Sequence, residues 1–281
     1  MIQLFFLTQL VAFWTTGAIS TDPPQPKASD LVDVKSYVYT VPNGLRTDVY
    51  ILSQFNISKG WHIYWKNPGS GGYPTTIQSD IKKGLSEEEI KYSVPSVFLE
   101  ENEIVYGYQN EAWLLKKETI DFNKIPDEIN ISINYFVCKE ICLFGQSDEV
   151  VKRPFQTKEK IEKKINVCID TLFPKNIIGL RGIAASFDGE YFEINFDLSS
   201  NGLFKNKKFI FFPDSTPGIN FGRSLFKKRK KNYVLTIPVS ISPENFLEMK
   251  PTIKMLISLE AVDGSLIGFW ITMPLDKLGE T

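Results

Sequence analysis

Cys138 and Cys142 are the residues whose types and spacing best support chemistry in this sequence. They lie in the run Val-Cys-Lys-Glu-Ile-Cys, so Cys142 follows Cys138 by four positions. If the chain turns at Lys139 and Glu140, this spacing allows the Cα separation of about 4.4–6.8 Å that a disulfide needs. A ring this small restrains the unfolded chain little, so stapling the fold is a poor reason for it. The spacing therefore favours a disulfide that opens and closes.

The element that must position this pair is a predicted strand over residues 128–137. Apolar side chains occupy its odd positions from Ile129 to Val137 and mostly polar ones its even positions, the two-residue period of a half-buried strand. Cys138 continues the even, outward-facing series. We therefore expect its thiol at the accessible side of a strand end.

The third cysteine, Cys168, belongs to a different pattern. Residues 157–173 carry apolar side chains at helical spacing between lysines and glutamates, and Pro174 follows. This predicts an amphipathic connecting helix whose apolar stripe includes Cys168. We expect that thiol to be buried as a small hydrophobic group.

A second notable run is Gly-Trp-His-Ile-Tyr-Trp-Lys-Asn-Pro-Gly, beginning at Gly60 and followed by Gly71, Gly72 and Pro74. Alternation places Trp61, Ile63 and Trp65 on one face of a strand and His62 and Tyr64 on the other, before a turn-rich loop. His62 is the only histidine of the chain. It is either a hydrogen-bonded structural residue or, if the loop folds over, a third ligand for Cu(I) beside Cys138 and Cys142.

The remaining patterns predict an exported all-β protein of two domains. Hydrophobic residues make up 43% and charged residues 23% of 281 residues, which is typical of a folded protein with a packed core. Alternating segments at 37–41, 47–57, 61–65 and 128–137, and again around 192–198, 233–241 and 253–259, predict antiparallel sandwiches. No βαβ alternation is visible. The predicted parts are a signal peptide at 1–20, a Pro-rich linker at 21–29, a sandwich at 30–155, the connecting helix at 156–176 and a second sandwich at 177–281.

Charge excludes one class of partner at the level of the whole chain. The formal net charge is −1, which argues against a global electrostatic partner such as nucleic acid. The basic run at 227–231 falls between predicted strands, where a solvated hairpin connection explains it.

The run from Gly60, with Gly72 and Pro74, and the run around Cys138 and Cys142, with Gly145, together resemble the N-terminal periplasmic domain of DsbD-type thiol:disulfide interchange proteins. The likeness covers about residues 30–155 and is strongest to the ScsB branch, which is linked to copper tolerance; cytochrome c biogenesis is another process of the wider family. It implies an immunoglobulin-like fold for this sandwich and a periplasmic location; from its strand pattern we expect the second sandwich to be immunoglobulin-like too.

The resemblance also implies a function and its partners. Cys138 and Cys142 would be the redox pair of a protein-disulfide reductase type of oxidoreductase, without a small-molecule cofactor. It would take two electrons from a membrane-embedded thiol donor on a separate chain and pass them to oxidised periplasmic proteins. Which cysteine attacks stays open.

Three functional hypotheses follow. The first is this thiol:disulfide relay. The second is Cu(I) binding by Cys138, Cys142 and possibly His62. The third is a non-catalytic exported sandwich that contacts another protein through its loops, with structural cysteines.

Overall fold

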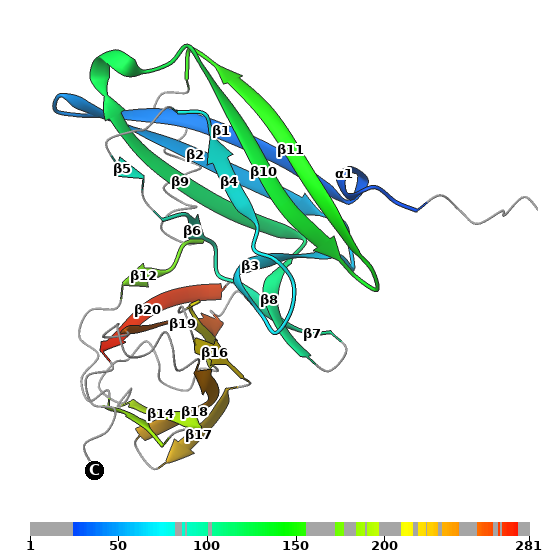
Figure 1. Cartoon of the computed structure of the whole chain (residues 1–281), viewed down its shortest axis with the longest axis vertical. Coiled ribbons are helices and arrows are strands. Elements are labelled where there is room, and N and C mark those ends of the chain that lie inside the picture. The colour runs from blue at the N-terminus through cyan, green and yellow to red at the C-terminus, as the bar shows by residue number, and fades with distance from the viewer. Residues whose placement is uncertain are drawn as a thin grey trace, which may run out of the picture.

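The structure, a computed structural model, is built almost entirely from antiparallel β-sheets (Figure 1). It describes residues 25–81, 86–87, 89–100, 103–155, 172–176, 184–188, 190–196, 209–215, 219–222, 224–229, 232–241, 252–260, 264 and 266–274. The predicted all-β class is confirmed. The predicted signal peptide at 1–20, Cys168 and all but the last two residues of the predicted helix at 157–173 lie outside these residues.

Two sheets form the first half of the chain. The first sheet has the order β1-β2-β9-β5, with β6 also paired to β9, and the second has the order β11-β10-β3-β8-β7, with β4 also paired to β10. The strands of these sheets and two short helical turns have the following bounds: α1 Ala28–Leu31, β1 Val32–Asn43, β2 Arg46–Ile57, β3 His62–Gly69, β4 Thr76–Ser79, β5 Ser86–Glu87, β6 Lys91–Tyr92, β7 Ser96–Glu100, β8 Glu103–Gln109, β9 Glu111–Asp121, η1 Phe122–Lys124, β10 Glu128–Cys138 and β11 Cys142–Lys152.

The core of this half follows from the alternation seen in the sequence. The odd-numbered residues Ile129 to Val137 of β10 are all buried, whereas most even-numbered ones are partly or fully exposed. They pack with Ile51 and Phe55 of β2 in one apolar cluster between the two sheets. Burying each of these side chains stabilises the folded protein by about 1.5–3 kcal/mol. The apolar face of β10 therefore turns inward and its other face outward.

Two further sheets form the second half. Their orders are β12-β20-β19-β15 and β13-β14-β18-β16, with β17 also paired to β18. All pairs are antiparallel except β12 with β20. The strands have the following bounds: β12 Lys175–Asn176, β13 Ala184–Phe187, β14 Tyr191–Phe196, β15 Phe209–Pro213, β16 Ile219–Phe221, β17 Leu225–Arg229, β18 Asn232–Ile241, β19 Thr252–Glu260 and β20 Leu266–Pro274.

The two halves share side-chain packing at their junction. Phe212 and Leu256 of the second half are fully buried members of the first half's apolar cluster. Trp65 of β3 is also fully buried, with its ring 5.9 Å from that of Phe212 and 6.1 Å from that of Trp270. Beside these rings, the Lys66 Nζ lies 2.7 Å from a carboxylate oxygen of Asp214. The two halves are therefore held together by a packed core and a largely buried ion pair.

Within the described residues, no helix has the length and apolar character needed to cross a membrane.

Candidate functional site

A disulfide joins the end of β10 to the start of β11. Cys138 and Cys142 are direct partners across the hairpin, with a Cα separation of 4.2 Å and an S–S distance of 2.10 Å. The turn consists of residues 139–141, closed by a hydrogen bond from the Lys139 amide to the Ile141 carbonyl at 3.1 Å. The predicted turn and bridge are both present.

The two sulfur-bearing residues differ sharply in exposure. Cys138 is only 1% exposed, in a small apolar cluster with Tyr64 and Val105, whereas Cys142 is exposed. The expectation that the Cys138 thiol is accessible is therefore wrong. Its outward parity is as predicted, but Tyr64 of β3 and Val105 of β8 cover that end of the strand. Cys142 is the sulfur that another molecule can reach.

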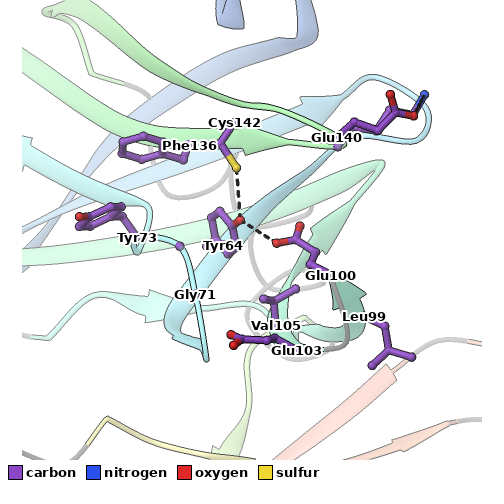
Figure 2. Close-up of a pocket in the computed structure, with 12 residues that line it drawn as sticks. Tyr64, Gly71, Tyr73, Leu99, Glu100, Glu103, Val105, Phe136, Glu140 and Cys142 are labelled. Carbon is purple, nitrogen blue, oxygen red and sulfur yellow. Dashed lines mark hydrogen bonds and ion pairs between the residues drawn. The ribbon is translucent and has the colours of Figure 1, made fainter.

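Cys142 opens onto a pocket of about 710 Å³ (Figure 2). Its lining comes from β3, the loop after it, the β7–β8 hairpin and the β10–β11 hairpin: Tyr64, Gly71, Gly72, Tyr73, Leu99, Glu100, Glu103, Val105, Phe136, Lys139, Glu140 and Cys142. Cys138 is not part of it. Three carboxylates and one ammonium line the pocket, so its charged groups are mainly acidic.

Tyr64 links Cys142 to Glu100 at the floor of this pocket. Its hydroxyl donates to the Glu100 Oε2 at 3.2 Å and lies 3.7 Å from the Cys142 Sγ (Figure 2). Burial, with the nearby Glu100 carboxylate, raises the pKa of the Tyr64 phenol well above its ordinary value. Tyr64 therefore keeps its proton at physiological pH and can donate it in a hydrogen bond.

His62 lies behind Tyr64, away from the pocket. His62 pairs with Cys138 in the register of β3 and β10. The His62 Nε2 lies 2.5 Å from the Glu100 Oε1, without the alignment of a regular hydrogen bond. Its ring stacks on Phe98 of β7. Burial lowers the pKa of His62, and the Glu100 carboxylate opposes this in part. His62 is thus buried beside Glu100 and Phe98, and both its hydrogen-bonded structural role and its role as a Cu(I) ligand stay predictions.

The loop after β3 is shaped around Tyr64. Gly72 has a φ of +89°, and a Cβ at this position would overlap the Tyr64 ring. Two features therefore require glycine at this position: the positive φ and the Tyr64 ring, which leaves no room for a Cβ. The next residue, Tyr73, stacks on Phe136, which in turn contacts Phe144. Tyr73 and Phe144 are mostly exposed, so aromatic surface flanks Cys142 on the side of β11.

Glu100 and Leu99 of β7 are among the site residues that sequence reasoning missed. They lie 36 positions or so from Tyr64, in a segment with no motif, and only the pairing of β7 with β8 and of β8 with β3 brings them to the pocket. Tyr64 had a usable signal, because alternation already set it beside His62 on the face opposite Trp65.

Comparison with known families assigns the first half of the chain. Residues 18–154 match the family model described as thiol:disulfide interchange protein DsbD, N-terminal. This part of the chain belongs to the DsbD N-terminal domain family. The cysteine pair, the Tyr64 strand and the pocket all lie within the matched DsbD N-terminal domain. No curated protein matches the sequence.

Two solved structures are similar to the chain. The crystal structure of the N-terminal periplasmic domain of ScsB from Proteus mirabilis matches with a TM-score of 0.67 and 15% identity, over 87% of this chain and 94% of that one. The DsbD N-terminal domain of Neisseria meningitidis, in its reduced form, matches with a TM-score of 0.32 and 14% identity, over 46% of this chain and 89% of that one. The ScsB match extends beyond the DsbD N-terminal domain, so the fold of both halves is shared.

Proposed function

We propose that this protein is a thiol:disulfide relay in which Cys142 exchanges with partners and Cys138 resolves. The observation that carries the proposal is the disulfide at the end of β10, with one sulfur buried and the other opening onto a pocket. Thiol–disulfide exchange needs an attacking thiolate to reach a sulfur. Of the two paired cysteines, Cys142 offers that access, and membership of residues 18–154 in the DsbD N-terminal domain family supports the same chemistry.

The cysteine pair is first reduced by an electron donor and then reduces a client protein. When the protein is reduced, a thiolate of the electron donor attacks the Cys142 Sγ, and Cys138 leaves as a thiolate. A second thiol of the donor then attacks the donor sulfur of this mixed disulfide. The donor leaves as a disulfide, and Cys142 is released as a thiolate. To donate, the Cys142 thiolate attacks a client disulfide, and Cys138 then attacks the Cys142 Sγ, which releases the reduced client. Two electrons move in each direction.

The partners and place of action follow the family. We propose that a membrane-embedded thiol protein supplies the electrons, that oxidised periplasmic proteins receive them, and that both halves are immunoglobulin-like sandwiches. The family description and the periplasmic origin of the ScsB domain support this proposal.

Tyr64 and Glu100 adjust the reactivity of Cys142 in opposite senses. A hydroxyl that donates to a thiolate stabilises it, whereas a carboxylate on the far side of that hydroxyl disfavours more negative charge nearby. In the disulfide state the Tyr64 hydroxyl donates its hydrogen bond to the Glu100 carboxylate. When Cys142 becomes a thiolate, it competes with Glu100 for this one donor.

This competition predicts opposite effects for two conservative variants. In the reduced protein, Tyr64→Phe is expected to slow alkylation of Cys142 by iodoacetamide at neutral pH by about threefold or more, because a charge-assisted hydrogen bond is lost. Glu100→Gln is expected to accelerate it by a similar factor, because a nearby negative charge is removed. Mass spectrometry of the peptide that contains Cys142 measures both rates. Glu128→Gln, at the far end of β10, is the control, and rate changes of the same sign in both variants would contradict the assignment.

The proposed function is tested by equilibrating the purified protein with glutathione redox buffers. A reversible two-electron transition between the dithiol and the Cys138–Cys142 disulfide is expected. A disulfide that stays closed under strong reductant would refute the relay and favour a structural bridge. Stoichiometric Cu(I) binding by the reduced protein, against a competing chelator and lost in Cys138→Ser, would support the copper alternative.

A further inference from the structure

A second groove begins where the pocket at Cys142 ends. It has a volume of about 340 Å³ and lies between the β7–β8 hairpin of the first half and β15 of the second. Its lining is almost wholly apolar: Val97, Phe98, Leu99, Ile104, Tyr106, Phe209, Ile210, Phe211 and Ser224. Leu99 lines both this groove and the pocket at Cys142, so the two hollows are neighbours along β7.

The walls of this groove are the edges of two sheets. Among the described strands, β7 is the last of its sheet and β15 is the last of another. Exposed edges in soluble proteins are usually blunted by charged residues or proline. Here they present Val97, Leu99 and Ile210, which are 36%, 70% and 41% exposed. Exposed apolar side chains gathered along such a groove mark a binding surface.

The far wall of the groove is anchored to the strand that carries the site. The Asn67 side-chain amide donates to the carbonyl of Pro213, the last residue of β15, at 2.7 Å. Lys66 bonds to Asp214, the next residue, also at 2.7 Å. Both anchors come from β3, the strand that carries Tyr64. These contacts therefore place the end of β15 relative to β3 and to Tyr64.

We propose that this groove binds the extended segment of an oxidised client protein that carries its cysteine, and that β15 makes the second half of the chain part of the client-binding surface. The inference rests on the proposed function, because the client must place a sulfur against Cys142. From there an extended chain follows β7 into the groove. Glu100 and Val97 lie three positions apart, or about 10 Å along a strand, and the Tyr64 hydroxyl separates Cys142 from Glu100, which adds to this distance. The favoured client therefore has a large apolar side chain about four residues from its cysteine.

Charge complements this shape at the Cys142 end. Glu100, Glu103 and Glu140 line the pocket, and Lys139 is its one cation among the described residues. A basic residue next to the client cysteine fits this acidic lining, whereas an acidic one is repelled. The occupant we infer is thus an extended, basic and apolar cysteine segment.

Two short peptide disulfides test the proposal. Each is a symmetrical disulfide of a peptide with one cysteine, an adjacent lysine, and either leucine or serine four residues away. The reduced protein converts one peptide disulfide into two peptide thiols while the Cys138–Cys142 bond forms. Wild type is expected to reduce the leucine peptide about tenfold faster, because the groove removes part of the leucine side chain from water. Ile210→Asp is expected to remove most of this preference.

Matched controls separate the groove from the exchange reaction. Ile267→Asp changes a residue of similar exposure (39%) on β20 of the same half that does not line the groove, and should keep the preference. The small hydroxyethyl disulfide should react equally with wild type and with Ile267→Asp, and its rate with Ile210→Asp serves to normalise the peptide rates of that variant. Equal rates for the two peptides, or a preference unchanged in Ile210→Asp, would overturn the proposal.

A peptide that cannot undergo disulfide exchange tests the groove independently of the proposed relay. The S-methylated leucine peptide with a fluorescent label should bind the oxidised protein, measured by anisotropy, and should lose affinity in Ile210→Asp. A protein that reduces no disulfide yet binds this peptide would sink the proposed function while leaving the groove intact. Self-association that depends on Ile210 and excludes the peptide would instead assign the groove to a second copy of the chain.

Discussion

Cys138→Ser, in its reduced form, is expected to accumulate a covalent adduct with a disulfide-bearing substrate protein, at about ten times the level of Cys142→Ser. The exposed Cys142 attacks the substrate disulfide and forms a mixed disulfide, and no Cys138 thiolate remains to release it. In Cys142→Ser the remaining sulfur of the pair is the buried Cys138, which a protein disulfide cannot reach. After an acid quench, non-reducing electrophoresis and mass spectrometry of the adduct measure the difference.

The double variant Cys138→Ser/Cys142→Ser is the control for this experiment. It retains Cys168, so any adduct it forms comes from outside the pair. Adduct levels that are equal in the two single variants, after subtraction of this background, would show that exposure does not select the exchanging sulfur. A reversed order would assign the exchange to Cys138.

Trp65→Ala is expected to lower the free energy of unfolding by about 3–5 kcal/mol, the usual cost of truncating a large buried aromatic side chain. Trp65 is fully buried and contacts Tyr106 in its own half and Phe212 and Trp270 in the other. Its loss opens a cavity where both halves pack. We therefore expect the two halves to unfold less cooperatively, as two transitions in urea followed by near-UV circular dichroism and by proteolysis.

Leu45→Ala provides the comparison for this stability measurement. Leu45 is 92% exposed in the turn between β1 and β2, and its truncation should change the free energy of unfolding by less than about 0.5 kcal/mol. A Trp65→Ala protein that unfolds in one transition, with a loss as small as that of Leu45→Ala, would show that the junction contributes little.

The junction of the two halves and the pocket at Cys142 share the strand β3. The strand that carries Trp65 into the junction also carries Tyr64 to the pocket at Cys142, with alternate side chains on opposite faces of β3. Packing on one face therefore sets the position of the hydroxyl on the other. For a relay protein, this connects the second half of the chain to the geometry around Cys142.

The sequence by itself determined the local features. The alternation around residues 128–137 located β10 and its buried face, and the spacing of Cys138 and Cys142 required a tight turn and allowed a disulfide. Alternation from Trp61 to Trp65 likewise separated the core side of β3 from the side of His62 and Tyr64. These features follow from a two-residue period and the reach of a short hairpin, which depend on neighbouring residues alone.

Only the tertiary structure decided the properties of the site. Which cysteine is exposed depends on Tyr64 and Val105, which come from other strands, and parity along β10 could not reveal their cover. Glu100 reaches Tyr64 through two strand pairings, and β15 borders β7 through the packing of the two halves. Burial and charge at a point are sums over all chain segments that meet there, so no single segment of the sequence contains them.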